Sequence, residues 1–144
     1  LIAGFGTAAM VAAEQLEGDA DHGRALAALL LDELASRQVR FSMVTADRNV
    51  VPGGLSIRID GVDADHLCAA LADKVQLSTG SACTSGQLRT SHVLEAMGFS
   101  MKSAAEVVRA FCHRYLEADD IRSAAAHIAA AVRQSAVATG EGLQ

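Results

Sequence analysis

Cys83 is the residue in this sequence whose surroundings best suit nucleophilic chemistry. It lies in the run STGSACTSG, residues 78–86, where its neighbours are glycine, alanine, serine and threonine. These side chains are too small to cover a thiol, so an accessible sulfur on a loop over about residues 78–90 is expected. Only a thiolate attacks, and local charge sets its pKa. A structural loop with an incidental cysteine is the alternative interpretation.

The other two cysteines have settings typical of buried thiols. Cys68 lies within an amphipathic helical pattern, and Cys112 follows an apolar strand-like run. Free cysteine behaves as a small apolar residue in such places. Three cysteines with irregular spacing and no CxxC motif favour neither a disulfide framework nor a structural zinc site. Reduced thiols in a cytoplasmic protein are therefore expected.

Arg109 is a candidate for binding a carboxylate. It interrupts the apolar run VVRAF, residues 107–111. A planar guanidinium matches a carboxylate with two parallel hydrogen bonds, which the ammonium group of lysine cannot do. Taken alone, such a residue is also compatible with a salt-bridged or snorkelling side chain on a strand.

The remaining polar residues show weaker patterns. His92 follows a capping serine and is interpreted as a surface group, and the other histidines lack metal-ligand or triad spacing: His22, His66, His113 and His127. Gly4 and Gly6 form a short GxG, but no strand precedes them and the third glycine is missing. We therefore predict a helix start packed closely against a neighbour there, rather than a phosphate loop.

The elements that position these residues can be predicted from periodicity and capping signals. Helices are predicted over about residues 2–17, 19–37, 63–74 and 91–98, and from about residue 119 onward. Strands are predicted over residues 39–45, 55–60, 75–77 and 105–111. This order indicates an α/β layer, with helices packed on a small, mostly antiparallel sheet. Residues after 138 are expected to form a frayed tail.

Composition bounds the possible functions. The chain has 144 residues and a formal net charge of −5, so one domain without a basic nucleic-acid surface is expected. No apolar run is long enough to span a membrane. Because the chain begins at Leu1 rather than methionine, we interpret it as part of a longer protein.

The segment from Ser78 to Gly98, STGSACTSGQLRTSHVLEAMG, resembles the active-site loop of group I cysteine desulfurases. This NifS/IscS branch of the class V aminotransferase family carries an SSGSACTS loop followed by a P-S-H/Y-V-L-R-A-x-G helix. The matching residues are Gly80, Ser81, Ala82, Cys83, Thr84, Ser85, Ser91, His92, Val93, Leu94, Ala96 and Gly98. The resemblance implies that Cys83 forms the family's persulfide.

A second segment extends the resemblance. The family carries S-I-R-F-S-x-G-R-F-T downstream of its cysteine, and the first arginine of that pattern binds the substrate carboxylate. Arg109 lies 26 residues after Cys83, in register with that arginine. The resemblance covers nearly the whole chain, from a first segment like the family's long linking helix onward. The departures are Gly53 and Ser56 where the family has asparagine, and Phe111 and His113 where it has serine and glycine.

The resemblance implies the small C-terminal domain of a fold-type I enzyme that uses pyridoxal phosphate. Such a transferase converts L-cysteine to L-alanine and passes the sulfur to an acceptor protein, such as an iron–sulfur cluster scaffold or a thiolation partner. A cytoplasmic homodimer is expected, with no direct contact to nucleic acid or membrane. The family's cofactor lysine lies in an S-x-H-K motif, whereas Lys74 and Lys102 lack it. The large domain that binds the cofactor is therefore expected to lie outside this chain, which alone should be inactive.

Two other interpretations stay open. The chain could be a standalone sulfur-carrier or interaction module derived from the desulfurase small domain. It could also be another aminotransferase-like small domain with an incidental cysteine, although the GSACTS match argues against this. An upstream S-x-H-K motif in the gene would favour the desulfurase fragment.

Overall fold

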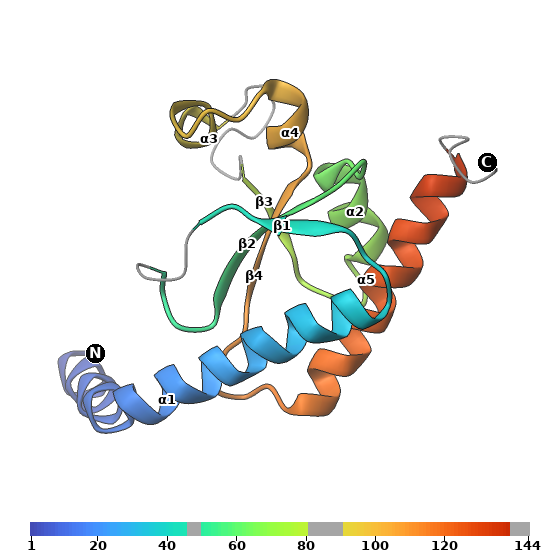
Figure 1. Cartoon of the computed structure of the whole chain (residues 1–144). Helices are drawn as coiled ribbons and strands as arrows, with labels where there is room; N and C mark the ends of the chain where they lie inside the picture. Colours follow the sequence, from blue (N-terminus) through green and yellow to red (C-terminus); the bar gives the residue numbers. More distant parts are fainter. Residues whose placement is uncertain (46–49, 81–90, 139–144) are drawn as a thin grey trace.

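A computed structural model of the chain describes residues 1–45, 50–80 and 91–138. Four strands form one antiparallel sheet in the order β1-β2-β4-β3 (Figure 1). The elements in chain order are α1 (Ile2–Ser36), β1 (Phe41–Met43), β2 (Gly54–Ile59), α2 (Ala64–Leu71), β3 (Ser78–Thr79), α3 (His92–Ala96), α4 (Met101–Ala105), β4 (Val107–Phe111) and α5 (Ala118–Ala138). The predicted α/β fold with a small antiparallel sheet is confirmed.

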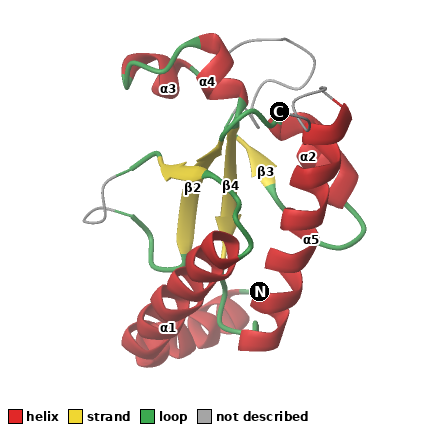
Figure 2. Cartoon of the chain, turned by 45° about the vertical axis from the view of Figure 1, so that its right-hand side comes forward, coloured by secondary structure: helices red, strands yellow, loops and turns green. Residues whose placement is uncertain are grey.

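The two faces of the sheet have different neighbours. One face carries Leu55, Ile57 and Val108 into the main core, which the buried stripes of α1, α2 and α5 complete. On the other face, Val107 packs with Leu94 and Ala104 beneath α3 and α4. These two short helices lie at one end of the sheet, and the long helices lie beside it (Figure 2). The rest of the second face has no helix packed on it in the described part of the chain.

The first helix differs from the prediction. Two helices separated near Gly18 were expected, whereas α1 runs unbroken from Ile2 to Ser36. One glycine costs only about 1 kcal/mol inside a helix, which the surrounding alanine and leucine offset. The predicted capping residue Asp19 instead forms an ion pair with Arg114.

The N-terminal half of α1 extends away from the rest of the chain (Figure 1). Its apolar residues, among them Ile2, Phe5 and Leu16, are exposed. The close packing expected at Gly4 and Gly6 is wrong for the described residues, because a Cβ at either position would meet nothing within 4 Å. Helical spacing predicts an apolar stripe on this helix, but it does not show whether another element packs on that stripe.

Strand boundaries also differ from the predictions, and β1 covers Phe41–Met43 rather than residues 39–45. The strand predicted over residues 75–77 lies at Ser78–Thr79, because within residues 75–79 only these two pair with β4. The strand predicted from residue 105 begins at Val107, and the short helix α4 precedes it. The signal missed was Ser100, whose side chain accepts a hydrogen bond from the backbone N–H of Ser103 at 3.1 Å and caps α4.

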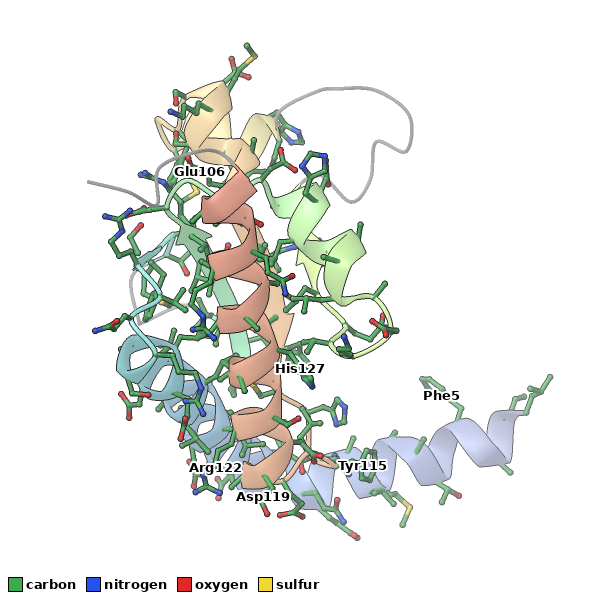
Figure 3. The ribbon with its side chains drawn as sticks, turned by 90° about the vertical axis from the view of Figure 1, so that its right-hand side faces the viewer. Phe5, Glu106, Tyr115, Asp119, Arg122 and His127 are labelled. Carbon is green, nitrogen blue, oxygen red and sulfur yellow. The ribbon has the colours of Figure 1, made fainter. Side chains whose placement is uncertain are left out.

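A buried carboxylate links the start of β4 to the end of β2. The side chain of Glu106 is only 9% exposed and accepts a hydrogen bond from Arg58 Nε at 2.7 Å. It also accepts one from the backbone N–H of Gly61 at 3.3 Å. The hydrogen bond that Arg58 donates to Glu106 raises the pKa of Arg58. Glu106 lies near the α4 end of the molecule, far from Arg122 near the start of α5 (Figure 3).

The tight turn before β2 depends on a glycine. Gly53 has a φ of +83°, and a Cβ there would overlap the carbonyl oxygen of Cys112. The chain closes at this point because the N–H of Cys112 donates to the Gly53 carbonyl at 2.8 Å. Gly23 of α1 packs on the same turn, where its Cβ would lie 3.2 Å from the Cα of Gly53. Close backbone packing therefore explains why this chain has glycine at position 53, where the family has asparagine.

We expect Gly53→Ala to lower the free energy of unfolding by about 3 kcal/mol, because it combines a left-handed backbone conformation with a backbone clash. Gly61→Ala is the matched control, since Gly61 has a φ of +74° but open space around it. That change should cost only about 1 kcal/mol. Urea denaturation of both variants measures the difference, and equal losses would contradict the clash at Cys112.

Candidate functional site

Arg109 lies at the centre of the uncovered part of the sheet. Its neighbours in register are Ser56 on β2 and Ser78 on β3. The side chain is exposed and lines an open cavity of about 750 Å³. Among the described residues it forms no ion pair. The interpretation of Arg109 as an internally salt-bridged residue therefore has no support in the described part of the chain.

Most of the positions that depart from the family's sequence pattern lie near Arg109. Alternation along a strand places Arg109 and Phe111 on one face, and His113 continues along the same chain. All three line the same cavity, and so does Ser56. Three of the four departures, Ser56, Phe111 and His113, thus lie where a ligand of Arg109 would sit. Sequence reasoning identified each change, but not that the pleat and pairing of β2 and β4 bring the three together.

Cys83 lies outside the described residues, as does most of the loop predicted over residues 78–90. The described residues do show where this segment leaves the sheet and where it returns. Ser78 is paired directly with Arg109, and Thr79 with Val108. Gly80 follows and packs so closely that a Cβ would lie 2.9 Å from Leu94 Cδ1. The chain re-enters at Ser91, the N-cap of α3.

The other cysteines are held in apolar surroundings on the helical side of the sheet. Cys112 is 3% exposed and belongs to the main core. Burial raises the pKa of its thiol above the ordinary value. Cys68 on α2 is partly buried, and its pKa is raised by burial and then by the negative charge of Asp65. Their predicted structural roles agree with these positions, because a raised pKa leaves less nucleophilic thiolate at neutral pH.

We expect alkylation of the folded chain at pH 7.5 to label Cys83 at least about tenfold faster than Cys112, since thiolate fraction and access set the rate. Cys68 should react at an intermediate rate, and labelling of Cys112 should become appreciable only at alkaline pH. Time-resolved peptide mass spectrometry after iodoacetamide treatment measures the three rates. Fast labelling of Cys112 at neutral pH would contradict its burial.

The described residues do not provide a pyridoxal phosphate site. The lysines Lys74 and Lys102 are both exposed, and neither lines the cavity around Arg109. His22 is engaged structurally, since its Nε2 lies 2.9 Å from the carbonyl oxygen of Leu116. In the described ranges, no three metal-ligating side chains gather into a possible metal site. Nor does any helix in those ranges have the length and apolar character needed to span a membrane.

The known proteins with similar sequences are named as cysteine desulfurases. A cysteine desulfurase from Frankia sp. is 39% identical over 133 residues, which cover 91% of this chain and 32% of that protein. The cysteine desulfurase IscS of Methylococcus capsulatus is 34% identical over 120 residues, covering 83% of this chain and 29% of its own length. The chain matches the C-terminal small domain of NifS/IscS-like cysteine desulfurases. No family model matches it.

Solved structures support the same fold for this chain. A NifS-like protein from Rickettsia africae superimposes with a TM-score of 0.76 at 20% identity, over 92% of this chain and 34% of that chain. Another NifS-like protein gives a TM-score of 0.71 at 22% identity, over 86% of this chain and 31% of its own. The chain thus spans about a third of the length of these relatives.

Proposed function

We propose that this chain is the sulfur-carrying small domain of a cysteine desulfurase, with Cys83 as the nucleophile and Arg109 as the carboxylate-binding residue. The observation that carries the proposal is the exposed side chain of Arg109, which forms no ion pair among the described residues and lies directly opposite Ser78, where the cysteine loop begins. Cys83 is three residues beyond Gly80 in the sequence. Three residues span at most about 10 Å, so the loop length limits how far the thiol lies from the arginine site.

The proposed reaction transfers sulfur from L-cysteine to this chain. Arg109 holds the substrate carboxylate through two parallel hydrogen bonds, which fixes the orientation of the substrate. The Cys83 thiolate attacks the substrate sulfur, an S–S bond forms, and the C–S bond breaks. The bonding electron pair stays on the substrate carbon, which takes up a proton to become L-alanine. Cys83 is left as a persulfide, so one difficult transfer is divided into two easier steps.

The rest of the enzyme is expected to come from sequence outside this chain. Pyridoxal phosphate, bound by the large domain in this family, supplies the electron withdrawal that weakens the C–S bond. We propose a homodimeric transferase in the cytoplasm that delivers sulfur to an acceptor protein, such as an iron–sulfur scaffold or a thiolation partner. Some relatives are named as mitochondrial cysteine desulfurases, so the compartment varies among relatives.

The test compares this chain with the complete protein that contains it. The complete protein, incubated with L-cysteine and dithiothreitol, should release sulfide and L-alanine in equal amounts. The isolated chain should release neither, and should show no absorbance of bound pyridoxal phosphate. Sulfide release by the isolated chain would contradict the assignment as a fragment. If the complete protein also lacks activity but accepts sulfur on Cys83 from another desulfurase, the carrier-module alternative holds instead.

A further inference from the structure

The cavity around Arg109 has a polar end and an apolar end. At the polar end, the guanidinium lies on the strand between Ser56 and Ser78, whose hydroxyl groups can donate to an anion. Thr45 lines the same cavity, and its Oγ1 is buried without a hydrogen-bond partner among the described residues. A buried hydroxyl without a partner is unfavourable, so a polar ligand atom there would be stabilising.

The apolar end of the cavity lies two residues further along β4, at Phe111. Phe111 is 56% exposed, and its partner in register on β2 is Gly54, which has no side chain to cover the ring. Val50 and Val51 line the cavity as well and are 41% and 69% exposed. Exposed apolar side chains gathered in one cavity favour an apolar ligand group, because its contact with them removes apolar surface from water.

We propose that the Arg109 cavity selects carboxylates whose other end is apolar, and that Phe111 is the residue that determines this specificity. The inference rests on the proposed function, in which Arg109 binds a carboxylate, and it defines the substrate class of that site. Residues two apart on a strand lie about 7 Å apart on the same face. A ligand held by its carboxylate at Arg109 can therefore place an apolar group two to four carbons away on Phe111. The thiol-bearing carbon of L-cysteine belongs to the small end of this class.

The experiment titrates the isotopically labelled chain with four carboxylates and follows the β4 backbone amides by NMR. The probes are acetate, butyrate, 3-phenylpropionate and succinate, with 3-phenylpropionamide as an uncharged control. We expect 3-phenylpropionate to bind at least about tenfold more tightly than acetate, which corresponds to about 1.4 kcal/mol. The affinity for butyrate should lie between those for acetate and 3-phenylpropionate. Succinate should bind no better than acetate, and the amide should not bind.

Two variants separate the polar and apolar ends. Phe111→Ser should remove the preference for 3-phenylpropionate while acetate binding stays unchanged. Arg109→Gln should abolish binding of all the carboxylates. Both residues are exposed, so neither change opens a core. The matched controls are Phe5→Ser, on the distant arm of α1 (Figure 3), and Arg133→Gln, exposed on α5, and both should bind as the unchanged chain does.

The outcomes distinguish this inference from the proposed function. If acetate binds at Arg109 but Phe111→Ser leaves the ranking unchanged, or if succinate binds best, the specificity inference is wrong and the carboxylate role of Arg109 stands. If Arg109→Gln leaves all binding intact, the carboxylate role itself is wrong. If 3-phenylpropionate shifts the residues around Cys112 and Ile128 instead of those lining the Arg109 cavity, the apolar end lies elsewhere and the role of Phe111 is wrong.

Discussion

Cys83→Ser is expected to reduce sulfide release by the complete protein by on the order of 10³-fold or more, because it removes the proposed nucleophile. Serine preserves the size of the side chain but is a far weaker nucleophile at neutral pH, and it cannot hold a persulfide. Turnover is measured as sulfide and L-alanine released from L-cysteine. Persulfide on the protein is measured by alkylation and peptide mass spectrometry after one turnover without reductant.

The other two cysteines provide matched controls. Cys68→Ser and Cys112→Ala each remove one thiol from the helical side of the sheet, where burial raises the thiol pKa. Each should retain sulfur transfer when activity is expressed per folded molecule, although Cys112→Ala will lower stability because that side chain is 3% exposed. A persulfide found on Cys112 of the unchanged protein, or full turnover by Cys83→Ser, would refute the assigned nucleophile.

Replacing Arg109 tests the second half of the proposed mechanism. We expect Arg109→Gln to lower kcat/KM for L-cysteine in the complete protein about 100-fold, since two charge-assisted hydrogen bonds are lost. Arg109→Lys should lower kcat/KM only about tenfold, because lysine keeps the charge but lacks the planar pair of donors. Most of the loss should appear as a raised KM, because the carboxylate does not react and is bound equally before and during the reaction.

The control for Arg109 is an arginine outside the cavity. Arg133→Gln removes the same charge from an exposed position on α5 and should leave kcat/KM unchanged. Denaturation curves of the Arg109 variants should match that of the unchanged protein, because the side chain is exposed and forms no ion pair among the described residues. A fall in kcat at unchanged KM would contradict a role in substrate binding and would instead indicate a role in the chemical step.

Most of the fold was predictable because local patterns were consistent with it. Alternation identified β2, with Leu55, Ile57 and Ile59 on the buried face. Capping identified α2, where the Asp63 carboxylate accepts a hydrogen bond from the N–H of His66 at 2.9 Å. Boundaries failed where pairing decided them. β3 consists of the two residues of this segment that pair with β4, and no local pattern predicts the strand at Ser78–Thr79 rather than at residues 75–77.

The sequence by itself determined the family, the candidate nucleophile at Cys83 and the carboxylate-binding candidate at Arg109, because these depend on residue types at fixed spacing. Tertiary structure alone decided that Ser56, Phe111 and His113 share one cavity with that arginine. The physical reason is that strand pairing places residues far apart in the chain directly opposite one another. It also decided the role of Asp19, because the ion pair with Arg114 depends on how the chain folds back.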